Sequence, residues 1–348
     1  MKPYFSWKTL CLLLCLALLA GCAAQNKPEP TMTPTTEPSA APETTGTWQA
    51  GIASVTSLKT NDAQADKEGS IEINTTIASL VLDDMGKVVY VSLDTAQNSG
   101  AFSNEGLGDA EKNAARPTKK EQGEGYGMIK ASSIGKEWHQ QAEALEAWMT
   151  GKTIEEIMNL PVGEDGKTTE ADVMTSCTIG VSDFLAAVEK ASQSLQPVAN
   201  AAAMHSASES ELTVKDAAAD ALGSVQVNTS YILMGTDEQG AVLFTLLDTA
   251  QNQGQFSAEG KVDMEKSQSS LTKGELKDGY GMVKASSIGK EWYQQIEGLT
   301  HWMEGKSAAE IEALPVDEAG KTTDPDLMTS CTIGVDGFKA LAAKALAD

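Results

Sequence analysis

The sequence predicts an α+β fold: two tandem copies of a unit in which a small antiparallel sheet packs with helices. The duplication rests on three segment pairs, each offset by 154 residues. They are LDTAQN at 93–98 and 247–252, YGM-x-KASSIGKEW-x-QQ at 126–141 and 280–295, and MTSCTIGV at 174–181 and 328–335. A period of this length suits a whole small domain and is too long for a solenoid unit. A functional site should therefore occur twice.

The first 22 residues have the pattern of an export signal. Lys2 and Lys8 precede the short apolar run CLLLCLALLA, and small residues follow it. The ending Leu-Ala-Gly-Cys at 19–22 resembles the lipobox of bacterial lipoproteins. That resemblance implies that residues 1–22 contain a lipoprotein signal peptide and that Cys22 is the lipid attachment site. The chain would then lie on the extracytoplasmic face of the cell membrane; the alternative is an ordinary cleaved signal with a chance cysteine.

Composition sets the boundaries of the remaining chain. Residues 23–47 are rich in Pro, Thr, Glu and Ala, which predicts an extended tether. Residues 48–192 then form repeat domain 1, residues 193–209 a linker, and residues 210–348 repeat domain 2.

Each unit begins with a predicted β-hairpin. Residues 71–82 are rich in Ile, Val and Thr, residues 83–86 supply an Asp/Gly turn, and KVVYVSL follows at 87–93. The next stretch, 94–125, is polar and reads as a long loop, as does its copy at 248–279. A loop of that length inside a compact domain is unusual and is often functional.

Helices follow the loop. Apolar residues at spacings of three and four predict a helix over 136–150, with Trp138, Ala142 and Leu145 on one face. A short helix is expected at 153–160 and a last one at 183–192. The Ala- and Ser-rich segment 193–224 is expected to be partly helical.

Charge and cysteine content exclude several classes of function. Asp and Glu number 49 against 26 Lys and Arg, so nucleic acid is not an expected partner. No histidine occurs in both copies, which argues against a metal or haem site and against a Ser-His-Asp triad. Cys177 and Cys331 are equivalent and are expected to be small buried side chains, although the sequence leaves open whether they pair.

Acidic residues occur at equivalent positions in the two copies. Three such pairs are Asp94/Asp248, Glu121/Glu275 and Glu137/Glu291. Nothing in the sequence brings any two of them together, so solvated surface positions are the default for each.

The closing segment of each unit carries the most specific pattern. It reads DVMTSCT at 172–178 and DLMTSCT at 326–332. It resembles the flavin-attachment pattern of the FMN-binding domain family, Asp-x-x-[Ser/Thr]-Gly-Ala-Thr. In that family the last threonine carries FMN through a phosphoester bond formed by a flavin transferase. The resemblance implies covalent FMN and a site made of the motif residues Asp172, Thr175, Thr178, Asp326, Thr329 and Thr332.

Two departures from the pattern put this resemblance in question. Ser176 and Ser330 replace the family glycine, and Cys177 and Cys331 replace the alanine. Glycine permits backbone angles that serine resists, so the tight turn that presents the threonine could be missing. The alternative is a plain strand with a small buried cysteine.

The resemblance implies a surface electron carrier rather than a catalyst, anchored in the membrane by its lipid and paired with a redox partner. The competing interpretation is a non-redox surface module. There, the duplicated YGM-x-KASSIGKEW segments and the loops before them would form a pocket for a small molecule or a partner.

Overall fold

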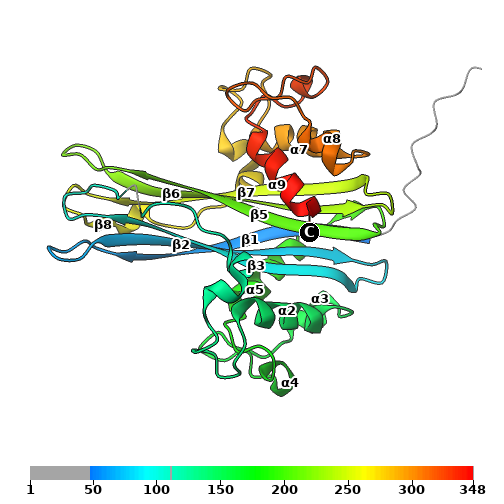
Figure 1. The fold of residues 1–348 in the computed structure, drawn as a ribbon, viewed down its shortest axis with the longest axis horizontal. Coiled ribbons are helices and arrows are strands. Elements are labelled where there is room, and N and C mark those ends of the chain that lie inside the picture. Colours follow the sequence, from blue (N-terminus) through cyan, green and yellow to red (C-terminus); the bar gives the residue numbers. More distant parts are fainter. Residues whose placement is uncertain (1–47, 110–111, 348) are drawn as a thin grey trace, which may run out of the picture. The chain divides into compact units, whose positions relative to one another are not determined.

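A computed structural model describes residues 48–109 and 112–347. These described residues belong to one compact unit (Figure 1). The predicted signal peptide, Cys22 and the predicted tether lie outside the described residues.

Two antiparallel sheets form the centre of this unit. The first has the order β3-β2-β1-β4, from β1 (Trp48–Asn61), β2 (Gly69–Leu82), β3 (Val88–Phe102) and β4 (Gln196–Val198). The second has the order β5-β6-β7-β8, from β5 (Ala203–Lys215), β6 (Gly223–Thr236), β7 (Val242–Phe256) and β8 (Val262–Asp263). The predicted fold class, α+β with duplicated sheet-and-helix units, is confirmed.

Each repeat contributes its own helices. The first has α1 (Lys119–Gln122), η1 (Gly123–Tyr126), α2 (Trp138–Met149), α3 (Ile154–Met158), α4 (Ala171–Met174) and α5 (Ser182–Ser192). The second has η2 (Met264–Lys266), α6 (Lys273–Leu276), η3 (Lys277–Tyr280), α7 (Trp292–Met303), α8 (Ala308–Glu312), η4 (Leu327–Thr329) and α9 (Asp336–Ala347). Within the described ranges, none of these helices has the length and apolar character needed to cross a membrane.

The helices cover the outer face of each sheet, and the inner faces of the two sheets pack on each other (Figure 1). Strand β2 shows why. Ala78 and Leu80 join a core cluster with the helices of repeat one, whereas Ile71 and Ile73 join a cluster with strands of repeat two. Because successive side chains of a strand point to opposite faces, one central strand serves both cores.

The two repeats are related by an approximate twofold symmetry, visible in their contacts. Phe102 stacks on its own copy, Phe256, with ring centroids 3.9 Å apart. The Ala63 N–H donates to Gly260 O at 2.8 Å, and the equivalent Ala217 N–H donates to Gly106 O at the same distance. Strand β5 runs through the predicted boundary between residues 209 and 210, so the chain enters repeat two directly as a strand.

Two expectations about local structure are wrong. Residues 94–102 are not loop, because β3 continues through Phe102 in register with β2. The segment 193–224 is not helical. It contains β4, β5 and the first residues of β6, because β5 pairs with β6 along its whole length. Such pairing outweighs the weak helical preference of an Ala- and Ser-rich stretch.

The predicted helices are confirmed. The helix expected over 136–150 is α2, with Trp138, Ala142, Leu145 and Met149 buried. Those expected at 153–160 and 183–192 are α3 and α5.

Candidate functional site

The motif at 172–178 forms a helical turn, so its interpretation as a plain strand is wrong. The Thr175 hydroxyl donates to Asp172 O at 2.7 Å, and the Cys177 N–H donates to Val173 O at 2.8 Å. The copy has the same bonds, from Thr329 to Asp326 O and from Cys331 to Leu327 O. These bonds hold the chain in a tight turn that ends at the candidate threonine.

Serine at the family's glycine position causes no backbone strain. Ser330 has φ −122°, and the one non-glycine residue with positive φ in the described part of the chain is Lys277. Because this φ is one that any residue adopts, the turn forms here without glycine. The expectation that Ser176 and Ser330 could prevent the tight turn is therefore wrong.

Thr178 is held by a buried glutamine that the sequence analysis missed. Gln141 Oε1 accepts the Thr178 N–H at 2.7 Å and the Thr178 hydroxyl at 3.1 Å. In the copy, Gln295 Oε1 accepts from Thr332 at 2.8 and 3.2 Å. Both glutamines are fully buried, so each orients its threonine from inside the core.

The same glutamine joins the two most strongly repeated segments. Its Nε2 donates to Ser132 Oγ at 3.2 Å and to Lys136 O at 3.0 Å, which satisfies the buried amide. Gln295 bonds in the same way to Ser286 and Lys290. Gln141 is the last residue of the repeated segment 126–141, and glutamine also stands at the equivalent position 295. This match between the copies was the sequence signal that could have identified the residue.

A buried carboxylate in each repeat shapes the loop before the long helix. Glu137, which is buried, accepts the N–H groups of Met128 and Ile129 at 2.7 and 3.0 Å. Glu291 does the same for Met282 and Val283. The pair Glu137/Glu291 is therefore structural, and the default interpretation of these acids as solvated is wrong.

The cysteines beside the threonines are buried and free. Cys177 and Cys331 belong to separate core clusters, so they do not pair in this fold. Burial raises the pKa of the Cys177 thiol, and it raises the pKa of Cys331 to about 11. The backbone N–H of Ile179 or Ile333 and the positive charge of Lys136 or Lys290 partly oppose these increases.

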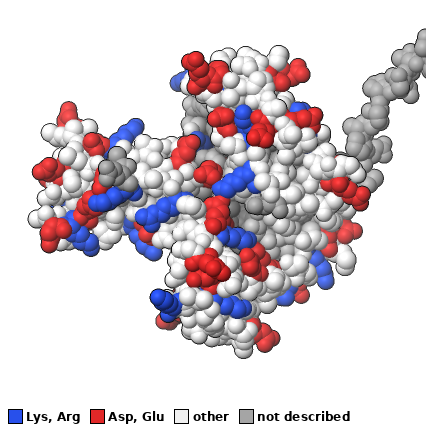
Figure 2. Space-filling model, in the orientation of Figure 1, with Lys and Arg blue, Asp and Glu red and all other residues white. Residues whose placement is uncertain are grey.

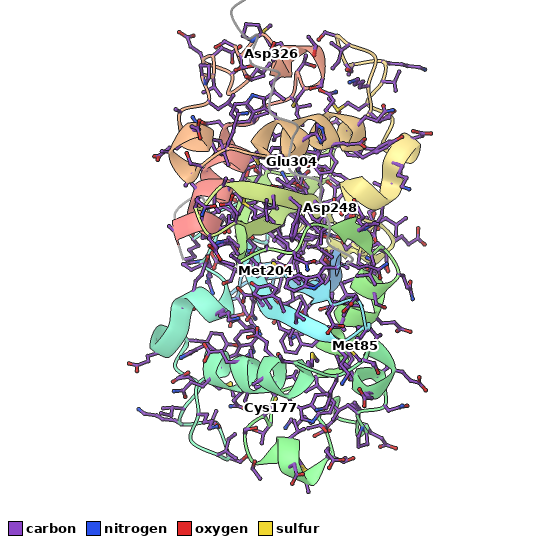
Figure 3. The ribbon with its side chains drawn as sticks, turned by 90° about the vertical axis from the view of Figure 1, so that its right-hand side faces the viewer. Met85, Cys177, Met204, Asp248, Glu304 and Asp326 are labelled. Carbon is purple, nitrogen blue, oxygen red and sulfur yellow. The ribbon has the colours of Figure 1, made fainter. Side chains whose placement is uncertain are left out.

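The structure assigns the motif aspartates a smaller part than the resemblance implies. Asp172 and Asp326 are exposed, and each contributes its backbone carbonyl to the turn. The two motifs lie at opposite ends of the compact unit, as the labels Cys177 and Asp326 in Figure 3 show. The two candidate sites therefore do not form one shared site.

The residues present supply the hydroxyl group that a phosphoester-linked flavin requires. Thr178 and Thr332 are half-buried, and each lies at the end of its tight turn. Loss of the hydroxyl hydrogen on esterification would leave the bond from the threonine N–H to the glutamine intact.

A different pair of sites lies between the repeats. One cavity of about 270 Å³ is lined by Asp94, Lys120 and Glu121 together with Ser206 and Ser208 of repeat two. The copy is a groove of about 760 Å³. It is lined by Asp248, Gly274 and Glu275 together with Ile52 and Ala53 of repeat one. The structure thus brings together acids that the sequence could not place.

Burial dominates the electrostatics of these acids. Desolvation raises the pKa of Asp94 and of Asp248. Hydrogen bonds oppose the shift at Asp248, which accepts from Thr249 N at 2.7 Å, Gly274 N at 2.8 Å and the Thr272 hydroxyl at 2.5 Å. Tyr231, fully buried, donates to the same carboxylate at 3.4 Å. On the face shown in Figure 2, acidic and basic side chains are interspersed, without a broad basic patch.

Comparison with known proteins gives one distant similarity. A protein named chlorophenol reductase, from Desulfitobacterium hafniense, is 31% identical over 120 residues. The match covers 31% of this chain and 36% of the relative, so this chain spans about a third of that protein. No family profile matches the chain, and no solved structure matches it.

Proposed function

We propose that this chain is a lipid-anchored electron carrier on the extracytoplasmic face of the membrane, with FMN esterified to Thr178 and Thr332. The flavin would supply reversible electron and hydride chemistry when bound. Gln141 and Gln295 would orient the attachment threonines, and Lys136 and Lys290 would place positive charge near the phosphate.

One observation carries the proposal: in both copies a buried glutamine fixes the motif threonine with two hydrogen bonds to one carbonyl oxygen. Holding a side chain in one rotamer from the core is what a precise attachment point requires. The distant similarity to a protein named chlorophenol reductase agrees with a redox role.

The positions of the motifs bear on how such a carrier would work. Because they lie at opposite ends of the compact unit, each flavin would exchange electrons with its own external partner. Direct exchange between the two flavins within one chain is not part of the proposal.

The test is the intact mass of the chain purified from its own host's membranes, because a foreign host can lack the transferase. We expect two flavin additions, and we expect Thr178→Ala and Thr332→Ala each to remove one. Thr175→Ala and Thr329→Ala are matched controls, since these neighbouring hydroxyls bond only to the backbone of the turn. A bare-chain mass in the native host would refute covalent flavin.

The anchor is tested separately. Cys22→Ala should abolish incorporation of labelled fatty acid and release the chain from the membrane fraction. Retention of label in that variant would contradict the proposed attachment site.

The non-redox alternative also has a specific observation in its favour. The cavities between the repeats are duplicated, and both draw residues from both repeats. A colourless protein whose ligand binding is unaffected by the threonine variants would favour that alternative.

A further inference from the structure

One exchange between the repeats opens space where the two sheets pack on each other. Tyr231 of β6 corresponds to Ile77 of β2 at the repeat offset of 154. Both side chains belong to one apolar cluster between the sheets. Tyr231 is fully buried, so its phenol ring fills this place on the Asp248 side. Isoleucine is shorter and has no hydroxyl, and Ile77 lines the cavity of about 270 Å³ on the Asp94 side.

Three further exchanges replace large apolar side chains by serine in the wall of this cavity. The serines that line it are Ser79, Ser92 and Ser206, and the residues at the equivalent positions are Leu233, Leu246 and Ile52. A serine side chain is smaller than that of leucine or isoleucine. The exchanges therefore widen the space and add hydroxyl groups to its wall.

On the Asp248 side, the tyrosine hydroxyl joins the two sheets. Tyr231 OH accepts a hydrogen bond from the Ser54 hydroxyl at 3.2 Å, and it donates one to Asp248 Oδ2 at 3.4 Å. Ser54 belongs to β1 of the first sheet and Asp248 to β7 of the second. One phenol hydroxyl thus satisfies a donor on one sheet and an acceptor on the other.

Ser208, the equivalent of Ser54, lacks this partner. Ser208 is 5% exposed, and its Oγ has no hydrogen-bond partner in the described structure. The residue lines the cavity from β5. Ser206, two residues earlier, bonds to the Tyr90 hydroxyl of the opposite sheet at 2.8 Å, so Ser208 faces that sheet too. A buried hydroxyl without a partner indicates a place for a group that can bond to it.

Asp94, the equivalent of Asp248, lacks the same partner. It accepts three hydrogen bonds, from the Thr95 N–H at 2.7 Å, the Lys120 N–H at 3.1 Å and the Thr118 hydroxyl. These match three of the four donors to Asp248. The fourth is the Tyr231 hydroxyl, for which Ile77 is no substitute. The cavity therefore has a donor and an acceptor that a single hydroxyl group joins on the other side.

The charges around the cavity favour a neutral ligand. Asp94 and Glu121 line it and would repel an anion. Lys120 also lines it and pairs with Glu146 at 2.7 Å, while Lys344 pairs with Glu121. Ammonium groups of the chain thus already lie beside these acids, and a ligand needs only to supply the missing hydrogen bonds.

We propose that the cavity between the repeats on the Asp94 side binds a small neutral phenol, whose hydroxyl takes the place that the Tyr231 hydroxyl has on the other side. The hydroxyl would accept from Ser208 and donate to Asp94, and the ring would lie against Ile77. A cavity of roughly 150 Å³ is enough for a benzene ring. The volume of about 270 Å³ therefore has room for the ring and its hydroxyl.

The probe is phenol, titrated calorimetrically into the full chain at neutral pH. We expect one site per chain and binding about tenfold tighter than that of anisole, the methyl ether, which cannot donate a hydrogen bond to Asp94. Benzoate, an anion with the same ring, should not bind. Absence of phenol binding, or equal binding of phenol and anisole, would overturn the proposal.

The duplication supplies the variants and their control. Ile77→Tyr builds the missing phenol into the chain and should abolish binding of the probe. Ser208→Ala removes the donor and should weaken phenol binding about fivefold. Ser54→Ala is the matched control, because it removes the equivalent hydroxyl on the other side, and it should leave phenol binding unchanged.

Two results with these variants would contradict the proposal. One is retained phenol binding in folded Ile77→Tyr, and the other is equal phenol binding by Ser208→Ala and Ser54→Ala. If circular dichroism shows that Ile77→Tyr does not fold, the serine pair decides alone, because loss of one hydroxyl leaves the packing almost intact. Phenol binding is measured by heat and covalent flavin by mass, so either proposal can fail without the other.

Discussion

Lys190 Nζ lies 2.7 Å from Glu275 Oε1, and the equivalent Lys344 makes the same contact to Glu121 from repeat two back to repeat one. Each lysine also donates to a backbone carbonyl of its own repeat, Ser54 O or Ser208 O, at 2.8 Å. The two repeats therefore bind each other through a symmetric pair of ionic contacts at the rims of the two cavities.

Replacing both lysines, Lys190→Met/Lys344→Met, should lower the free energy of unfolding by about 2 kcal/mol. The figure is small because the side chains are about 30% exposed and water screens the pairs. Urea unfolding measures it. Lys167→Met is the control, because its pair with Asp165 is more exposed and should contribute almost nothing. Equal midpoints for both variants would contradict a role in joining the repeats.

Gln141→Leu should destabilise the chain by about 3 kcal/mol. The leucine leaves the Thr178 N–H, the Thr178 hydroxyl and Lys136 O without their partner. Chemical denaturation gives the difference. Gln122→Leu, which removes an exposed bond to Pro117 O, should change stability by less than about 1 kcal/mol. Similar losses for the two variants would show that the Gln141 amide has no special part in the fold.

The contributions of Asp248 and Asp62 to stability should depend on pH in opposite directions. Burial raises the pKa of Asp248 above 3.8, so its contribution is complete below that value and is lost as pH rises through the folded-state pKa. The wild type should therefore gain stability over Asp248→Asn as pH falls from neutral to about 4.5. Thermal unfolding of both proteins across this range measures the difference.

Asp62 is the matched control for that experiment. The Val262 N–H lowers the pKa of Asp62 from 3.8, so its contribution is present above 3.8 and is lost as pH falls through the lower folded-state pKa. The advantage of the wild type over Asp62→Asn should shrink in acid. The same trend for both substitutions would rule out burial as the cause of the Asp248 shift.

The two cysteines should be unreactive in the folded protein. Both are fully buried and their thiol pKa values are raised, so few thiolates form near neutral pH. A thiol reagent should modify Cys177 and Cys331 only as fast as the chain opens, and denaturant should make both react at once. A disulfide between them, detected by mass after alkylation, would contradict their placement in separate cores.

Much of the helical structure could be predicted from the sequence. The spacing of Trp138, Ala142 and Leu145 fixes the face of α2, because an amphipathic helix buries a repeating set of positions whatever it packs against. The strand β5 could not be predicted. Its Ser-, Glu- and Ala-containing sequence forms a strand only because β6 supplies a partner along its length.

The sequence by itself determined the duplication, the α+β class and the position of each motif threonine, because these depend on local pattern and on identity at a fixed offset. Only the tertiary structure decided which residues meet. It placed Gln141 under Thr178, and it joined Lys190 to Glu275 across 85 positions of sequence. Such contacts arise where packed sheets bring distant strands together, and hydrophobic burial sets that packing without leaving a local signal for the polar pairs it aligns.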